Sequence, residues 1–430
     1  MLPATADEAA TQLHQLKMTI DELTTLEKLN NAFYSATKAS KWKPSTQRYR
    51  SNLLQNNIDL QEELRSGKYH VEPTINFWIN ERGKRRYIES PKVKDRIVQK
   101  MLTTEILTPY LTMPLIYDNY ASLRGRGVTL ARKRINIMLR RFIQEYGIEG
   151  YVLLVDVKEY FASIDHEILK EMVHDRIHEP EEIMGLIDYV IDTSSAADKG
   201  LNLGSEAPQI FSVFYLSPVD NYIKTVRGCR YYGRYADDMI IIARTKEELK
   251  DLQIGIEDQL KKLKLRINEH KTQIIKLSRG FTYLQIKYSI DPKTLKIIKR
   301  PTHKKIARER KRLKKFRKLY DNKILTELEI HNAYKSWRNS VTKDCNACKR
   351  TIRSTDRLYE ELFPEHEQHV RQTRQEILKE IRKEYKDDIC RRAGKRTHPD
   401  RKGDHGLYSR KVPAGHRKPG NIQVESMDRS

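Results

Sequence analysis

The chain has 430 residues, of which 82 are lysine or arginine and 58 are aspartate or glutamate, so its formal net charge is +24. This length exceeds the range of about 100 to 200 residues that is usual for one domain and predicts a multi-lobed body. The excess of positive charge favours a polyanionic partner, with nucleic acid ahead of a membrane surface. No run approaches the roughly 18 apolar residues of a spanning helix, and the N-terminus lacks the pattern of a signal peptide. We therefore expect a cytoplasmic protein without a membrane partner.

The four cysteines do not form the dense pattern of a secreted disulfide scaffold and fit a reducing cytoplasm. Cys345 and Cys348 have half of a zinc-site spacing, which Cys390 and His398 could complete. The second half lacks a tight spacing, so we prefer the interpretation that these are ordinary thiols of a helical region.

The first 300 residues alternate between helical and strand patterns. Residues 5–40 are predicted to be helical, because leucine and isoleucine recur every three to four residues. Alternation of apolar and polar residues around Gly83 predicts a hairpin, and the helix DRIVQKMLTTEILTPYL follows it. The fully apolar run YVLLVDV predicts a buried strand, after which Asp165 is a plausible N-cap of the helix HEILKEMVHDRI.

The second part of this region contains a predicted strand, tight turn and strand around Tyr235–Asp238. It is preceded by the loop KGLNLGSEAPQ and the predicted helix IFSVFYLSPVDNYIKTV. A helix over 246–264 and short strands near LRIN, TQIIKL and FTYLQIKYS are expected after it.

Beyond residue 300 the composition becomes strongly basic. Segment 304–318 carries ten basic residues and one acidic residue, and its apolar residues keep one stripe of a helix, which leaves the other face available to phosphates. Further helices are predicted at 324–340 and 350–390. The last 40 residues have the composition of a segment that is disordered or folds only on RNA.

Three aspartates carry the chemistry that the sequence indicates. Asp156 ends an apolar strand, and Asp237 and Asp238 lie at the tip of an apolar hairpin, so carboxylates occur where the flanking sequence predicts core. Buried like charges need a partner, and Mg²⁺, with Mn²⁺ as an alternative, prefers such oxygen ligands. Two ions about 3.5 to 4 Å apart can stabilise the attacking and leaving oxygens of nucleotidyl transfer. Each carboxylate alone would be read as an acidic turn or a strand-end cap.

The strings VLLVDVKEYFASIDH and GRYADDMIII resemble the A and C motifs of reverse transcriptases. The resemblance implies that Asp156 and Asp237 are the main metal ligands, that Asp238 is an auxiliary ligand, and that Tyr235 contacts substrate. It also implies that Phe161 excludes a ribose 2′-hydroxyl, which makes DNA the expected product. The alternative for Phe161 is a core aromatic residue.

Other segments between about residues 70 and 290 resemble further motifs of the same family. RRYIESPKVKDRIVQKML and YASLRGRGVTLARKRI are similar to its fingers motifs, which makes Arg96, Arg124 and Arg126 candidates for binding the incoming triphosphate; surface or template contacts are the alternative. LRINEHKTQII is similar to motif D, so that Lys271 becomes a candidate proton donor to the leaving pyrophosphate, or else a solvated loop lysine. FTYLQIKY resembles the primer grip, with Gln285 in place of the usual glycine.

The loop GLNLGSEAPQIF discriminates among subfamilies. Leu203 and Gly204 stand where most bacterial reverse transcriptases have a Gln-Gly pair. The arrangement resembles the G-x-x-x-S-Q pattern of diversity-generating retroelement enzymes, with Pro208 in place of serine. In that family the altered segment accompanies low fidelity at template adenines, so Gln209 is a candidate residue of the substrate pocket. A polar residue near a helix N-terminus is the alternative.

We therefore expect an α+β fold of the right-hand polymerase type, with an antiparallel palm sheet and a helical thumb. The expected function is RNA-directed DNA synthesis in a diversity-generating retroelement. The expected partners are an RNA template, an RNA/DNA duplex, dNTPs and a small basic accessory protein. The alternatives are a phage-defence reverse transcriptase and a catalytically inactive RNA-binding protein; a group II intron maturase is disfavoured because no zinc-endonuclease tail is evident. The expected domains are an N-terminal helical region (1–60), fingers and palm (61–290), a thumb (291–365) and a basic extension (366–430).

Overall fold

The computed structural model describes residues 17–364, except 82–83, 196 and 203, together with residue 379. The helices and strands between residues 20 and 362 lie in one compact unit that ends at Phe363. They form an α+β fold with antiparallel sheets, as the sequence predicts. Within the described residues, no helix combines the length and the apolar character that crossing a membrane requires.

The N-terminal helices are α2 (Ile20–Leu23), α3 (Leu26–Thr37), α4 (Pro44–Ser51) and α5 (Leu53–Arg65). The prediction of continuous helix over 5–40 is wrong in the described part. Thr19 caps α2 in a capping box with Glu22, and the Thr25 side chain accepts a hydrogen bond from Lys28 N and starts α3 as a separate helix. Residues 5–16 lie outside the described part of the chain.

The predicted hairpin is confirmed as strands β1 (Ile75–Glu81) and β2 (Lys84–Ser90), which pair antiparallel from Ile75 opposite Ser90. Gly83, expected in its turn, lies outside the described residues. A continuous helical stretch follows, made of α6 (Val93–Leu102), the π-helical turn η1 (Thr103–Leu107) and α7 (Thr108–Thr112). It confirms the helix predicted there.

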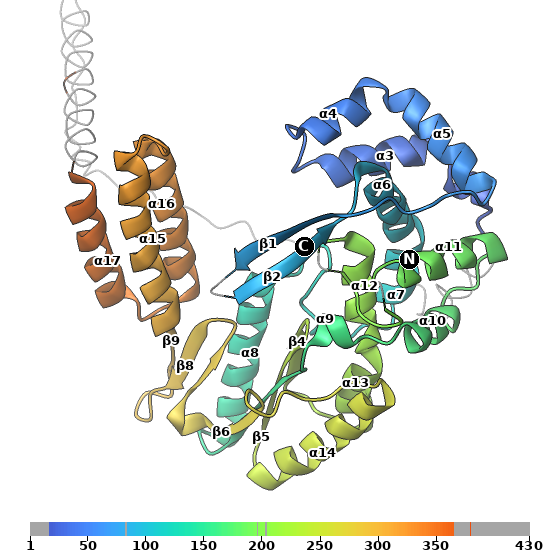
Figure 1. The fold of residues 1–430 in the computed structure, drawn as a ribbon. Coiled ribbons are helices and arrows are strands. Elements are labelled where there is room, and N and C mark those ends of the chain that lie inside the picture. Colours follow the sequence, from blue (N-terminus) through green and yellow to red (C-terminus); the bar gives the residue numbers. More distant parts are fainter. Residues whose placement is uncertain (1–16, 82–83, 196, 203, 365–378, 380–430) are drawn as a thin grey trace, which may run out of the picture. The chain divides into compact units, whose positions relative to one another are not determined.

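The central sheet has the strand order β4-β5-β3-β6 and is antiparallel throughout (Figure 1). Its strands are β3 (Tyr151–Asp156), β4 (Tyr232–Tyr235), β5 (Asp238–Ala243) and β6 (Gln273–Lys276). Both faces are covered, which explains why β3 and β5 are apolar at almost every position. Leu153 and Ile241 face a core that includes helix α14 (Lys246–Lys262), whereas Val152 and Ile242 face helix α8 (Val128–Tyr146).

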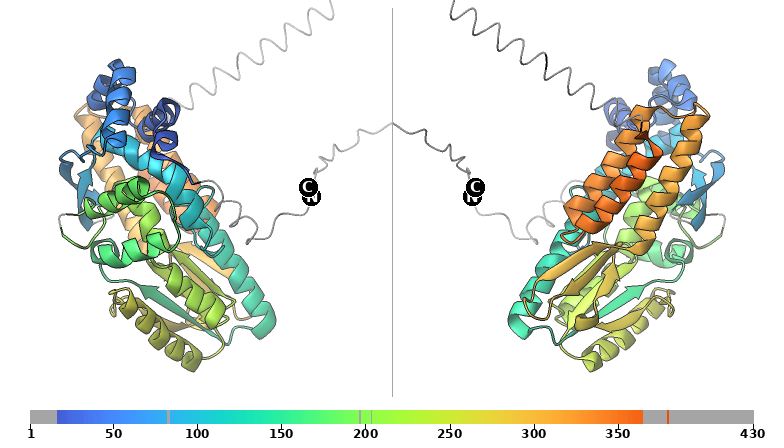
Figure 2. Two further views of the ribbon diagram at one scale, coloured as in Figure 1. Left: turned by 90° about the vertical axis from the view of Figure 1, so that its right-hand side faces the viewer. Right: turned by 90° about the vertical axis from the view of Figure 1, so that its left-hand side faces the viewer.

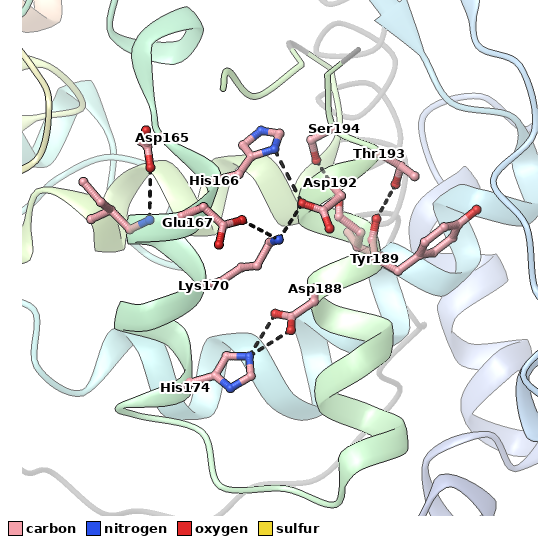
Figure 3. A network of polar contacts seen from close by, with 12 residues as sticks. Asp165, His166, Glu167, Lys170, His174, Asp188, Tyr189, Asp192, Thr193 and Ser194 are labelled. Carbon is pink, nitrogen blue, oxygen red and sulfur yellow. Dashed lines mark hydrogen bonds and ion pairs between the residues drawn. The ribbon is translucent and has the colours of Figure 1, made fainter. Parts of the chain in front are cut away.

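Helices α9 (Tyr160–Ser163), α10 (His166–His174) and α11 (Glu181–Asp192) follow β3. The Asp165 side chain accepts a hydrogen bond from Ile168 N and caps α10, as predicted. Figure 3 shows how ion pairs join α10 to α11: Lys170 lies 2.9 Å from Asp192, and His174 lies 3.0 Å from Asp188. This pairing stabilises the segment directly after the first aspartate strand.

The helix predicted over 210–226 is divided into α12 (Glu206–Tyr215), α13 (Ser217–Asn221) and the π-helical turn η2 (Tyr222–Val226). Pro218 explains the division, because it has no backbone N–H to continue the helical ladder. The strand predicted near LRIN is also wrong: it forms only a single bridge, between Ile267 and Val157.

A second antiparallel sheet contains β7 (Phe281–Tyr283), β8 (Ile286–Ile290) and β9 (Ile297–Pro301). It leads into α15 (His303–Asp321), α16 (Glu327–Asp344) and α17 (Lys349–Leu362), which lie side by side around a small apolar core (Figure 2). The helix predicted over 350–390 is described only to Leu362, where α17 ends. Most of the predicted basic extension lies outside the described residues.

Candidate active site

The site is built where two strands of the central sheet end. Tyr235 pairs with Asp238, so Ala236 and Asp237 form a two-residue turn between β4 and β5. Ala236 has a φ of 54°, a left-handed conformation that is uncommon for alanine. On the other side of β5, Asp238 lies opposite Asp156 at the end of β3. The sheet thus brings together three aspartates that are up to 82 positions apart in the sequence.

Asp156 and Asp237 line one pocket of about 710 Å³. Its opposite wall is segment 265–271, and it also contains Glu257 and Lys261 from α14. Charges of both signs line its walls: five carboxylates, from Asp156, Glu159, Asp237, Glu257 and Glu269, and four cationic groups, which suit phosphate oxygens. These cations are Lys158, Lys261, Arg266 and Lys271, and the titratable His270 lies beside them.

Asp156 is nearly buried, at 5% exposure, and its carboxylate is held by the opposite wall. The Asn268 side-chain amide donates to Oδ1 at 3.1 Å, and the Lys271 ammonium group donates to both oxygens, at 2.6 Å for Oδ2. The backbone is fixed as well, because Asn268 N donates to the Asp156 carbonyl at 2.7 Å. Lys271 therefore lies in the pocket with Asp156.

The oxygen donors of Asp156 and Asp237 fit a hard cation such as Mg²⁺, which binds through one or two carboxylates and keeps water and phosphate ligands. The Lys271 ammonium group forms an ion pair with the Asp156 carboxylate. Within the described part of the chain, no group of three or more His, Cys, Asp or Glu side chains is arranged as a complete metal site. Asp156 and Asp237 alone would not complete the coordination of such an ion, and phosphate oxygens would have to complete it.

The backbone of Asp238 is fixed from the second sheet. The Tyr283 hydroxyl on β7 donates to the Asp238 carbonyl at 2.7 Å. Burial and the nearby Asp238 raise the pKa of Tyr283 well above its ordinary value, so this hydroxyl keeps its proton. The sheet β7-β8-β9 is in this way attached to the end of β5.

Phe161 is half-buried in α9, and its ring packs edge-on against Tyr160 at 5.7 Å between centroids. Its carbonyl accepts a hydrogen bond from Leu201 N at 2.7 Å, and Gly200 N donates to the Ile164 carbonyl at the same distance. The segment that carries Phe161 is therefore bonded to the start of the loop that discriminates among subfamilies. Leu203, in that loop, lies outside the described residues.

Among the described residues, none of the predicted substrate contacts lines the aspartate pocket, and this includes Phe161. In the described chain, the lining of the aspartate pocket does not include Tyr235, Gln209 or any of the three predicted arginines. Gln209 is exposed on α12, and Tyr235 is half-buried on β4.

The three arginines differ in what they contact. Arg96 donates to the Ala36 carbonyl and to Ser40, and burial lowers its pKa. Arg126 donates to the carbonyls of the 116–119 segment, whereas Arg124 is exposed in the same loop region. Of the three, Arg124 is the arginine whose exposure best suits a ligand contact.

The candidate zinc ligands Cys345 and Cys348 are free thiols in an apolar cluster with Val341 and Ile352. Burial raises the pKa of Cys345 to about 11, which opposes the thiolate that zinc requires. Cys390 and His398, the two residues that could complete the site, lie outside the described chain. The surroundings of Cys345 and Cys348 support ordinary buried thiols.

Sequence reasoning missed a buried ion pair beside the aspartate turn. The Arg234 guanidinium on β4 is 0% exposed and lies 2.6 Å from Asp220 on α13, which is 1% exposed. The sequence did contain a signal for this pair. Arg234 is a charged residue in an apolar strand next to the aspartates, and an arginine that is buried at such a position must have a partner.

Residues 76–288 match the family model described as "Reverse transcriptase (RNA-dependent DNA polymerase)". This match spans just under half of the chain and includes the central antiparallel sheet whose strand ends carry the three aspartates. The chain contains a reverse transcriptase domain, and its α+β fold is of the reverse transcriptase type. Comparison with curated proteins gave no match.

Solved structures of telomerases are similar to this chain. Apo telomerase from Candida tropicalis, truncated from the C-terminal domain, is 14% identical with a TM-score of 0.41, over 57% of this chain and 59% of that chain. Telomerase from Candida albicans in complex with a TWJ fragment of telomeric RNA is 12% identical with a TM-score of 0.41, over 66% and 55%. The chain spans about half the length of these telomerase chains.

Proposed function

We propose that the protein copies an RNA template into DNA by two-metal nucleotidyl transfer at the pocket of Asp156 and Asp237. The observation that carries this proposal is the shared pocket: the carboxylates of Asp156 and Asp237 line one cavity whose walls also carry four cationic side chains. The matched reverse transcriptase domain includes all three aspartates. The substrates of this reaction would be dNTPs and an RNA/DNA duplex.

In this proposal Asp156 and Asp237 would hold Mg²⁺ or Mn²⁺, with Asp238 as an auxiliary ligand. When bound, two such ions supply stabilisation of the attacking and leaving oxygens. Lys271 would donate a proton to the departing pyrophosphate, a role that its place in the pocket supports. Phe161 would exclude the ribose 2′-hydroxyl, and Arg124 and Arg126 would bind phosphate.

A primer-extension assay with the double substitution Asp237→Ala and Asp238→Ala tests the catalytic assignment. We expect the double variant to lose nucleotide incorporation while its affinity for RNA stays close to that of the wild type. Binding of RNA rests mainly on basic residues elsewhere, which the substitutions leave in place. An unchanged rate of incorporation would refute the assignment and favour an inactive RNA-binding palm.

We further propose that the enzyme serves a diversity-generating retroelement, in which it copies an RNA template repeat together with a small basic accessory protein. The support is the sequence GLNLGSEAPQ, whose Gly200 and Leu201 are bonded to the Phe161 segment and whose Gly204 approaches Ile88 on β2. Primer extension on adenine-rich and adenine-free RNA tests the role. Errors should concentrate opposite adenines; equal accuracy on both templates would remove the ground for this role.

A further inference from the structure

We propose that Arg234 and Asp220 are positioning residues that hold Asp237 in its metal-binding orientation; this inference rests on the proposed function. Arg234 lies two positions before Ala236, the first residue of the aspartate turn, and does not line the pocket among the described residues. It therefore acts through the turn rather than on the substrate.

The guanidinium group of Arg234 makes four hydrogen bonds in three directions. It donates to both carboxylate oxygens of Asp220, at 2.8 and 2.6 Å, and to the Val213 carbonyl on α12 at 2.9 Å. The remaining nitrogen, Nη1, donates to the Ala236 carbonyl at 2.9 Å. One side chain thus attaches the aspartate turn to helices α12 and α13.

The contact with Ala236 bears directly on Asp237. The Ala236 carbonyl belongs to the peptide group that joins Ala236 to Asp237, so the bond fixes the plane of that peptide. Ala236 is in the left-handed region, which is strained for alanine and is held in place by neighbouring contacts. The contact from Arg234 opposes a return of this peptide to an ordinary conformation.

The Asp220 carboxylate keeps the arginine in this position. Burial would lower the pKa of Arg234, and the Asp220 carboxylate more than offsets this, so the pKa lies above its ordinary value. The Tyr232 hydroxyl donates to the same carboxylate. A planar guanidinium can make a bidentate contact and still reach two carbonyls, whereas a lysine ammonium group cannot reproduce this fork.

A buried ion pair is weak support for stability, because well-packed apolar residues often stabilise a core equally well. The position of Arg234 next to the aspartate turn suits a different task, which is to restrict that turn to one conformation. The role is comparable to that of the outer residues of metal sites, which orient the ligands without touching the ion.

The test compares Arg234→Gln, Arg234→Lys, Asp220→Asn and the double variant Arg234→Gln/Asp220→Asn in the full-length protein. The double variant removes both charges, which avoids an unpaired buried charge and protects the fold. The matched control is Arg132→Gln, because Arg132 forms another largely buried pair, with Asp344, at side-chain exposures of 12% and 10%. Mn²⁺ binding is measured by electron paramagnetic resonance, and hydrogen exchange of the 235–238 amides is measured in the metal-free protein.

We expect Arg234→Gln and the folded double variant to bind Mn²⁺ about 10- to 100-fold more weakly than the wild type, with faster exchange at the turn. Arg234→Lys should recover part of the affinity. The control should lower the melting temperature without weakening Mn²⁺ binding. Wild-type Mn²⁺ affinity and turn exchange in the folded double variant would overturn the inference. A wild-type protein that binds Mn²⁺ but incorporates no dNTP would instead refute the proposed function.

Discussion

The ammonium nitrogen of Lys271 lies 2.6 Å from Oδ2 of Asp156, and this pair joins the loop of segment 265–271 to the end of β3. The Asp156 side chain is 7% exposed and that of Lys271 is 51% exposed. The nearly buried carboxylate therefore receives its counter-charge from the more exposed partner, which can leave toward solvent when another cation binds.

Replacing Lys271 by methionine should lower the melting temperature in EDTA by about 2 to 4 °C, because Asp156 loses its cationic partner. Added Mg²⁺ should then raise the melting temperature of the variant by more than that of the wild type. Lys158→Met, in the same pocket, is the matched control. Equal responses of Lys271→Met and wild type to Mg²⁺ would contradict competition for Asp156.

Phe161→Ala should admit ribonucleotides, because a smaller side chain in α9 leaves room for a 2′-hydroxyl. We expect the preference for dNTP over rNTP, measured as a ratio of kcat/KM values, to fall by about 10- to 100-fold. Incorporation of dNTPs should persist. An unchanged preference accompanied by a lower melting temperature would identify Phe161 as a core aromatic residue only.

The exposed lysines of α15 should bind phosphates. Lys311, Lys315 and Lys318 are spaced by four and three residues and are exposed on one face. Replacing all three by alanine should reduce the slope of log Kd against log salt concentration by up to about 0.9 for each lost phosphate contact. A triple alanine variant of the exposed α14 lysines, with the same change in charge, should keep the wild-type slope; equal losses would indicate a general charge effect. The three control positions are Lys246, Lys250 and Lys262.

Gln285→Gly should stabilise the protein. Leu284 and Gln285 form the turn between β7 and β8 with φ values of 45° and 65°, which glycine adopts without steric cost. We expect a gain of roughly 1 kcal/mol in the free energy of unfolding, measured in urea, because glycine removes the strain of the positive φ. Little is lost in exchange, since the contact of Arg308 with the Gln285 side chain is long, at 3.5 Å. Gln285→Ala, which keeps the strain, is the control, and a loss of stability with glycine would show that the Gln285 side chain matters more than the backbone.

The thiol of Cys345 should react slowly below pH 10. Burial raises its pKa from an ordinary value near 9.0 to about 11, so the folded chain keeps a proton that the unfolded chain loses. The free energy of unfolding should therefore decrease as the pH rises from about 9 to about 11, and Cys345→Ser should flatten this decrease. Alkylation by iodoacetamide, followed by mass spectrometry, should accelerate over the same interval. Rapid labelling of Cys345 at pH 8 would contradict the burial.

The sequence by itself determined the elements with strong patterns and their order. Apolar runs identified β3 and β5, the alternating segment identified the β1-β2 hairpin, and the basic amphipathic segment identified α15. Local sequence was sufficient to predict these elements, because the spacing of apolar residues and the identity of turn residues are determined over a few neighbouring positions. Asp156 and Asp237 were found from their places at apolar strand ends and from the resemblance to motifs A and C, and Lys271 from the resemblance to motif D; all three line one pocket.

Only the tertiary structure decided which distant residues act together. The Arg234–Asp220 pair, the contact of Asn268 with Asp156 and the attachment of the Phe161 segment to Leu201 join positions that are far apart in the sequence. Helix boundaries in the N-terminal region were also missed, since side-chain caps at Thr19 and Thr25 outweigh the apolar period. A periodic pattern reports which face of an element is buried, whereas the partner on that face depends on how the whole chain packs.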